Sequence, residues 1–389
     1  MLWGVATSSY QVEGGIEHAD WSAFERRLGP GFTGANEACG HYQHALSDLA
    51  EIARLGLNAY RFSVEWSRIE PAEGRIDQAA LAHYRQVVLS ATELGLEPVV
   101  TLHHFTLPEW LAERGGVLEP RFASRLGRLA RLVGSALPAT WWVTINEPVV
   151  LAVMGYLSGE WPPGERSLLR ARQAVSALAE AHAAAYAALK EADPGRRVGI
   201  AKHLTPILPH RPANLVDQAG SRLQHRFFNR DFYRRTKGSH DFLGVNFYAR
   251  SYARGLTGVR RSRPGEAVSQ MGWVTDARDL TAVLNWLRPS GLPILILENG
   301  LATTDERLRS AYLHSHLAAL MQARRSGLPV AGYLYWTLWD NFEWRAGWGP
   351  AFGLCPRPAV GERFAWRPAA GLLARAAASD GHDLGTDPG

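Results

Sequence analysis

The stretch Leu292–Gly300 constrains the fold most, because a run of apolar residues in it leads directly into Glu298 and Asn299. An apolar run of this length, flanked by a proline and a glycine, is typical of a strand that is covered on both faces, as in a parallel sheet. The run Trp141–Ile145 leads in the same way into an asparagine and Glu147. Two glutamates so far apart in the chain can meet only if their strands end on the same face of one sheet or barrel.

A strand-like run followed by a helix-like run recurs along the whole chain, which is typical of a parallel α/β fold. The sequence predicts eight strands, at Leu2–Ala6, Leu57–Phe62, Glu97–Leu102, Thr140–Ile145, Val198–His203, Phe242–Asn246, Pro293–Leu297 and Val330–Trp336. It predicts helices between them at Ala45–Leu55, Leu81–Leu94, Phe122–Leu132, Leu168–Glu191 and Ala311–Arg325. Because this alternation is unbroken, we predict that residues 1–389 form one catalytic domain, a single (β/α)8 TIM barrel.

The charge pattern argues against nucleic acid as a partner. The formal net charge is +5, but the only lysines are Lys190, Lys202 and Lys237, and the arginines are scattered along the chain. No apolar run is long enough to span a bilayer, and the N-terminus lacks a signal-peptide pattern. Cys39 and Cys355 do not have the spacing of metal ligands. We therefore expect a reduced, cytoplasmic protein with no metal, cofactor or membrane partner, and the sequence leaves its oligomeric state open.

Polar and aromatic residues follow nearly every predicted strand, and in a barrel they would meet at one face. They are Gln11, Arg61, His104, Asn146, Asn246, Tyr248, Trp336, Glu343 and Trp344. Such a set suits a polyhydroxylated ligand, because amides and carboxylates bond hydroxyl groups and flat rings pack against the C–H faces of a sugar. His103 and His104 are adjacent on a strand and point to opposite faces, so a shared metal ion is disfavoured.

A pair of carboxylates beside a bound sugar is what hydrolysis of a glycosidic bond requires, because the leaving oxygen needs a proton while the anomeric carbon needs electron density. Arg61 and Tyr248 are the neighbours that we expect to hold Glu298 ionised. Glu147 has no obvious basic neighbour in the sequence. We therefore expect the pKa of Glu147 to be raised and assign it the role of proton donor.

Long motifs spread over nearly the whole chain resemble glycoside hydrolase family 1, the β-glucosidase family. They are Leu2–Gly14, Tyr60–Ser63, Trp66–Ile69, Thr101–Pro108, Thr144–Pro148, Gly244–Tyr248, Ile296–Gly300 and Trp336–Trp344. The resemblance implies Glu298 as the nucleophile and Glu147 as the acid/base residue. It implies substrate-binding roles for Gln11, His104, Asn146, Tyr248, Trp336, Glu343 and Trp344. It also implies that Arg61 and Asn246 support the nucleophile.

The chain departs from the family pattern in several places, one of which is Gly40, where members commonly have an aspartate. The segments around Pro209–Arg222 and Ala253–Met271 are short for the family, which leaves the preference for the leaving group open. After Leu354 the usual ending is replaced by Cys355-Pro356-Arg357, and the residues that follow match poorly. We expect a trimmed or distorted final helix and no loss of the chemistry.

The sequence therefore predicts an exo-acting β-glycosidase that retains configuration, with β-glucosidase activity favoured and a small β-glycoside or oligosaccharide as substrate. Activity toward β-galactosides, β-fucosides or β-mannosides stays open, because the same residues accept several epimers. A catalytically silent sugar-binding barrel also stays open, since a fold does not guarantee activity. Glu343 argues against a 6-phosphosugar, because its carboxylate would repel the phosphate.

Overall fold

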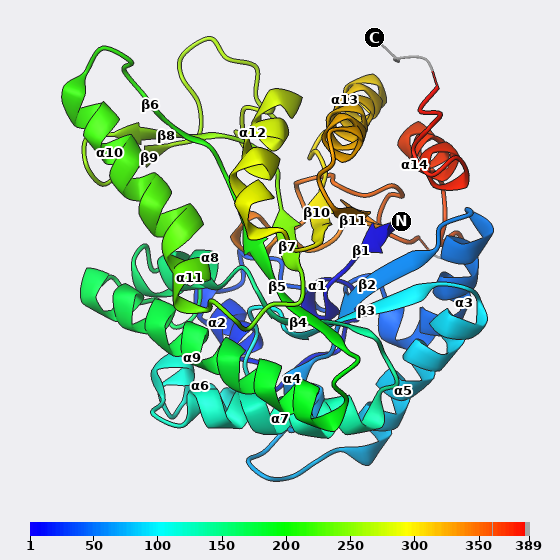
Figure 1. The fold of residues 1–389 in the computed structure, drawn as a ribbon. Coiled ribbons are helices and arrows are strands. Elements are labelled where there is room, and N and C mark those ends of the chain that lie inside the picture. The colour runs from blue at the N-terminus through cyan, green and yellow to red at the C-terminus, as the bar shows by residue number, and fades with distance from the viewer. Residues whose placement is uncertain (360, 386–389) are drawn as a thin grey trace.

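The computed structural model describes residues 1–359 and 361–385, and eight of its strands close into a barrel (Figure 1). These strands are β1 (Leu2–Ala6), β2 (Ala59–Ser63), β3 (Glu97–His103), β4 (Trp141–Asn146), β5 (Arg197–His203), β7 (Leu243–Asn246), β10 (Ile294–Asn299) and β11 (Val330–Trp336). Each strand pairs in parallel with its neighbours in sequence order, and β11 closes the ring against β1. The prediction of a (β/α)8 TIM barrel is confirmed.

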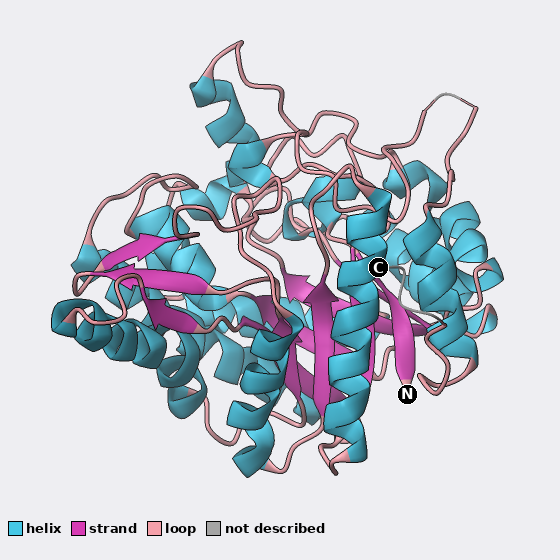
Figure 2. Ribbon diagram, turned by 90° about the horizontal axis from the view of Figure 1, so that it is seen from above, coloured by secondary structure: helices cyan, strands magenta, loops and turns pink. Residues whose placement is uncertain are grey.

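The helices lie outside the ring of barrel strands, some along its outer side and some in the loops beyond the strand ends (Figure 2). They are α1 (Ser9–Val12), α2 (Asp20–Leu28), α3 (His41–Arg54), α4 (Trp66–Ile69), α5 (Gln78–Glu93), α6 (Glu109–Ala112), α7 (Phe122–Ala136), α8 (Pro148–Tyr156), α9 (Leu168–Ala192), α10 (Leu215–His225), α11 (Asp231–Arg235), α12 (Ala277–Leu287), α13 (Glu306–Arg325) and α14 (Pro368–Ala378). Within the part of the chain that the structure describes, no helix is both long and apolar enough to cross a membrane.

Two of the predicted helices begin earlier than their apolar pattern indicates, because an aspartate caps each of them. The carboxylate of Asp77 accepts hydrogen bonds from the first backbone N–H groups of α5, and that of Asp305 does the same for α13. These N-caps satisfy donors that the helix itself cannot satisfy. The start of each helix is therefore set by the cap, several residues before its first buried side chain.

Between β5 and α12 the sequence predicted β7 but not the elements on either side of it. There, β6 (Ile207–Pro209) pairs in parallel with β8 (Ser251–Arg254), and β8 pairs in antiparallel fashion with β9 (Gly258–Arg260). Helix α10 packs against β6 and β8. The segments around Pro209–Arg222 and Ala253–Met271, which are short for the family, thus contribute to one small sheet and the helix packed on it.

Side chains of the barrel strands alternate between two apolar cores. On β10, Leu295 and Leu297 belong to the core inside the barrel, whereas Ile294 and Ile296 belong to the core between the strands and the helices. Gly244 on β7 allows the strands to approach, because a Cβ atom there would lie 2.3 Å from the carbonyl oxygen of Ile200. The strands are thus covered on both faces, which leaves their carboxyl ends as the place for polar chemistry.

Ion pairs of two arginines attach the segment after Cys355 to the rest of the barrel. Arg363 pairs with both carboxylate oxygens of Asp48 on α3, at 2.9 and 2.6 Å. Arg367 pairs with both carboxylate oxygens of Asp340, at 2.8 and 2.7 Å. We expected a trimmed or distorted final helix; instead α14 is a helix of 11 residues with an apolar, buried face.

We expect Arg367→Ala to lower the free energy of unfolding by about 2 kcal/mol, because Asp340 would lose its bidentate partner at a site that is largely closed to water. The two side chains are only 17% and 18% exposed. Urea denaturation monitored by fluorescence measures the change. Arg375→Ala, at an exposed position of α14, is the matched control and should change stability by less than about 0.5 kcal/mol. Equal effects of the two substitutions would show that the Arg367–Asp340 pair is not stabilising.

Candidate active site

Irregularities at the ends of β4 and β10 turn Glu147 and Glu298 into the mouth of the barrel. The register of β10 shifts after Ile296 against both neighbouring strands, and that of β4 shifts after Val143 against β5. With strict alternation Glu298 would share the outward face of Ile296 and point toward the helices. The shift therefore re-aims the carboxylate, as β-bulges near active sites do.

A cavity of about 410 Å³ at the barrel mouth is lined by both carboxylates. All seven residues predicted to bind substrate line the same cavity: Gln11, His104, Asn146, Tyr248, Trp336, Glu343 and Trp344. Arg61 and Asn246 are fully buried behind its wall. The barrel thus brings together residues from both ends of the chain.

A chain of hydrogen bonds through buried side chains links the two carboxylates. Arg61 donates from Nη1 to Glu298 Oε1 at 2.5 Å and from Nη2 to Asn146 Oδ1 at 2.7 Å. Asn246 Nδ2 donates to the same Asn146 oxygen at 3.1 Å and to Glu147 Oε1 at 2.8 Å. We predicted that Asn246 supports the nucleophile; its amide instead contacts the acid/base candidate, so that prediction is corrected.

Tyr248 completes the surroundings of Glu298, because its hydroxyl donates to Glu298 Oε2 at 2.6 Å. Burial raises the pKa of Glu298 to about 7, the charge of Arg61 opposes this increase, and the charge of Glu147 adds to it. The hydrogen bonds from Tyr248 and Arg61 favour the ionised form. Glu298 is therefore a desolvated carboxylate whose ionised form depends on two donors.

The surroundings of Glu147 differ from the expectation of a carboxyl without basic neighbours. Burial raises its pKa, but the nearby imidazole of His203, the amide of Asn246 and the charge of Lys202 together hold the pKa below its ordinary value. The expectation of a raised pKa for Glu147 is therefore wrong. Because Glu147 and Glu298 interact strongly, the two carboxyls titrate as a pair, and neutralising one changes the proton affinity of the other.

Lys202 and His203 are functional candidates that the sequence reasoning missed. They are the last two residues of β5, the one predicted strand whose end received no site residue. His203 lines the cavity, and Lys202 is fully buried behind it. Their position could have indicated a role, because every other strand end in the barrel carries a side chain of the site.

One wall of the cavity is built as a platform of rings and hydrogen-bonding groups. The indole of Trp336 stacks on His104, with ring centroids 6.0 Å apart and an interplanar angle of 13°, and it donates to Glu343 Oε1 at 3.1 Å. Gln11 Nε2 donates to the backbone carbonyl of residue 342 at 2.8 Å. Burial raises the pKa of Glu343 to about 8; the bond from Trp336 opposes this, and the nearby carboxylates add to it.

Backbone strain concentrates at this cavity. Phe105, Glu147 and Trp344 line it, and each has a positive φ, of 73°, 43° and 54°. Side chains other than glycine adopt this region at a cost, and such residues cluster at functional sites. The strain is therefore consistent with a site whose side-chain positions are fixed by the surrounding fold.

Comparison with known proteins identifies the family of this site. The model for the family described as Glycosyl hydrolase family 1 matches residues 1–234 and 211–356, well over half of the chain. The chain belongs to glycosyl hydrolase family 1.

Relatives of this family 1 chain agree along almost its whole length. It is 30% identical to Beta-glucosidase A of Thermotoga maritima over an alignment of 413 positions, gaps included, that covers 91% of each chain. It is 33% identical to the solved β-glycosidase from Pyrococcus horikoshii, with a TM-score of 0.91 over 97% of this chain and 93% of that one. A Thermotoga maritima β-glucosidase solved with glucoimidazole is 27% identical, with a TM-score of 0.91 over 98% of both chains. The protein is therefore a glycoside hydrolase of the β-glycosidase class.

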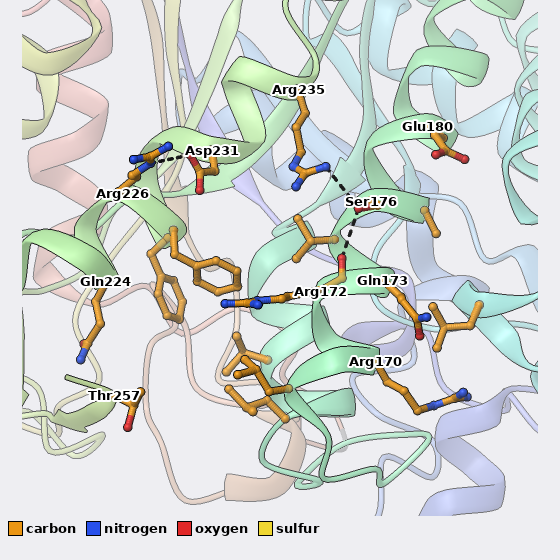
Figure 3. A pocket seen from close by; sticks show the side chains of 18 of the residues that line it. Arg170, Arg172, Gln173, Ser176, Glu180, Gln224, Arg226, Asp231, Arg235 and Thr257 are labelled. Atoms are coloured by element: carbon orange, nitrogen blue, oxygen red, sulfur yellow. Dashed lines mark hydrogen bonds and ion pairs between the residues drawn. The ribbon is translucent and has the colours of Figure 1, made fainter. Parts of the chain in front are cut away.

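A larger hollow of about 1100 Å³ lies on the flank of the family 1 enzyme, between α9 and the segment from α10 to α11 (Figure 3). Its polar side chains make local contacts: Arg235 donates to Ser176 Oγ at 3.2 Å, and Arg226 lies 3.5 Å from Asp231. Apolar side chains such as Leu223 form much of the wall. Because the polar groups of the smaller cavity converge on two carboxylates, the chemistry is assigned there.

We expect Tyr248→Phe to move the acid limb of kcat/KM to higher pH by about one unit. The hydroxyl of Tyr248 favours ionised Glu298, so without it the pKa of Glu298 rises further and this carboxylate takes up its proton at higher pH. The pH profile of hydrolysis of an aryl β-glycoside measures the shift. Tyr186→Phe removes a hydroxyl that bonds Asp241 outside the cavity and should leave the profile unchanged. An unmoved acid limb in Tyr248→Phe would contradict the role of this hydroxyl.

Proposed function

We propose that this glycoside hydrolase is an exo-acting β-glucosidase that cleaves terminal β-D-glucosides with net retention of configuration. The observation that carries the proposal is the hydrogen-bond chain through Arg61, Asn146 and Asn246, which ties Glu147 and Glu298 into one unit at one cavity. This arrangement supports a double displacement, in which a nucleophile and a proton donor act on the same sugar.

In the first step Glu298 attacks the anomeric carbon while the glycosidic bond breaks, and Glu147 gives its proton to the leaving oxygen. The products are a glycosyl ester on Glu298 and a free alcohol. Arg61 and Tyr248 donate to Glu298, so they favour its ionised form and orient the attacking oxygen. In the proposed site Asn146 faces the sugar and is itself oriented by Arg61.

In the second step Glu147 acts as a base. Formation of the ester removes the negative charge of Glu298, and the pKa of Glu147 falls because the repulsion between the two carboxylates is gone. Glu147 can then take a proton from a water molecule, whose oxygen attacks the anomeric carbon. The sugar leaves in the β configuration, Glu298 regains its charge, and Glu147 is again protonated.

The identity of the glycone, the sugar that the enzyme releases, is proposed from the residues on the cavity wall opposite the leaving group. Gln11, Glu343 and the ring of Trp336 offer hydrogen bonds and a flat face to one terminal sugar. The Glu343 carboxylate disfavours a 6-phosphate. Relatives named as β-glucosidases favour glucose. Galactose or fucose is the second candidate, because the hydroxyls of epimers can bond the same amide and carboxylate groups.

We also propose that the enzyme works in the cytoplasm. Cys39 and Cys355 are both free and buried, as expected for a protein in a reducing compartment. The proposed partner at the site is a small β-glycoside or oligosaccharide.

The first test is a panel of aryl β-glycosides that carry glucose, galactose, fucose, mannose or 6-phosphoglucose, with Glu298→Ala as the blank. We expect turnover of unphosphorylated sugars, fastest for the glucoside, and a loss of at least about 10⁴-fold in the blank. Proton NMR in the first minutes identifies the anomer that is released. The β anomer is expected; the α anomer would overturn retention, and a folded but silent enzyme would favour the sugar-binding alternative.

We expect Glu147→Ala to lose activity in proportion to the basicity of the leaving group. An alkyl glucoside needs a proton to depart and should react at least about 10³-fold more slowly, whereas a 2,4-dinitrophenyl glucoside needs none and should form the ester almost normally. Pre-steady-state release of the phenol measures the first step. An equal loss on both substrates would contradict the assignment of Glu147 as the acid.

A further inference from the structure

Two basic side chains stand beside the acid/base carboxylate at the end of β5. Nδ1 of His203 lies 3.6 Å from Glu147 Oε1, and 21% of the His203 side chain is exposed. The exposed part faces the cavity that the carboxylates line. Lys202 is fully buried, and its Nζ donates to the backbone carbonyl of His203 at 2.7 Å. The imidazole is thus at the cavity surface, with a buried amine behind it.

Further contacts fix the position of His203. Its ring stacks on that of Tyr248, with centroids 6.2 Å apart and an interplanar angle of 23°. The backbone N–H of Leu204 donates to the carbonyl of Asn246 at 3.0 Å, and Asn246 also holds Glu147 through its amide. The imidazole therefore lies between Glu147 and the tyrosine that bonds the nucleophile.

We propose that His203 is a positioning residue of the acid/base step, where its imidazole, backed by the amine of Lys202, biases Glu147 toward the ionised form. This inference rests on the proposed function, because it concerns Glu147 as both acid and base. The second step needs the ionised carboxylate, whereas the first step needs the protonated one. His203 therefore helps to set the pH above which the first step fails.

Other titratable groups act on Glu147 from the remaining walls of the site. The anionic or ionisable ones are Glu298 at the end of β10, Tyr248 after β7 and Glu343 after β11. Arg61 on β2 and His104 after β3 are linked to Glu147 by hydrogen bonds that run through Asn146 and Asn246. The two glutamates favour protonated Glu147, and the basic side chains of β5 oppose them. Removing the imidazole should therefore shift the balance toward the protonated acid.

The kinetic test compares His203→Gln with the wild type on two substrates that share the best glycone of the panel. For an alkyl glycoside, whose departure needs the proton of Glu147, we expect the alkaline limb of kcat/KM to move up by about one pH unit. For a 2,4-dinitrophenyl glycoside, which needs no proton, that limb should stay in place. His210→Gln changes a half-buried histidine outside the cavity and should move neither limb.

Two kinetic outcomes would overturn the proposal. An unmoved alkaline limb with the alkyl glycoside would show that the imidazole does not bias Glu147. Equal shifts with both substrates would show that the substitution acts on a group other than the acid. A fall in kcat or stability without a shift would assign His203 a structural role only.

A second measurement separates this inference from the proposed function, because it needs no turnover. The pH midpoint of the Glu147 carboxyl signal is followed by NMR in the wild type and in His203→Gln, with Glu147→Gln used to assign the signal. We expect the midpoint to be about one pH unit higher in His203→Gln, because the imidazole no longer favours the ionised carboxylate. An unchanged midpoint overturns the inference even in an active enzyme. A shifted midpoint in a protein that hydrolyses no glycoside supports the contact and overturns the glycosidase function alone.

Discussion

The ion pair between Arg61 and Glu298 is the interaction on which the rest of the site depends. The guanidinium is fully buried, and its other donors go to Thr101, Asn146 and the carbonyl of Leu297. Removing one partner of such a pair typically costs 3–5 kcal/mol, because the other charge is left buried and unpaired. The same guanidinium that holds Glu298 therefore also orients Asn146, and through it the amide that holds Glu147.

The site gathers more carboxyl groups than this one guanidinium can balance. Glu147, Glu298 and Glu343 face one small cavity, and burial raises the pKa of two of them, Glu298 and Glu343, to about 7 and 8. Keeping these carboxyl groups close together lowers the stability of the fold, as is common at active sites. The large double core of the barrel offsets it, and positive φ angles at Phe105, Glu147 and Trp344 show that the backbone shares the strain.

The sequence was sufficient to predict the barrel and most of its site because both depend on local patterns. An apolar run that ends in Asn146 and Glu147, or in Glu298 and Asn299, indicates a buried strand with polar residues at its tip. In a parallel barrel all such tips share one face, so a list of tip residues is already a list of neighbours. The residues predicted to line the pocket do so for this reason.

The sequence could not predict the register of the strands or which side chains contact each other. The shift after Ile296 that turns Glu298 inward depends on how β10 pairs with two strands that are distant in sequence, and a shift of one residue reverses the face. For the same reason the amide of Asn246 was assigned to the wrong carboxylate. Lys202 and His203 were missed because a basic pair at a strand end has no motif of its own, and its meaning comes only from the contact with Glu147.

Trapping of the covalent intermediate tests the central claim most directly, namely that the nucleophile held by Arg61 is Glu298. An activated 2-deoxy-2-fluoro β-glucoside, or the galactoside if the panel favours it, forms the glycosyl ester faster than water can remove it. After incubation and proteolysis, mass spectrometry should find one fluorosugar per chain, attached to Glu298 in the peptide that contains residues 294–299. A label on another residue, or a chain that hydrolyses glycosides without ever carrying the label, would contradict this account.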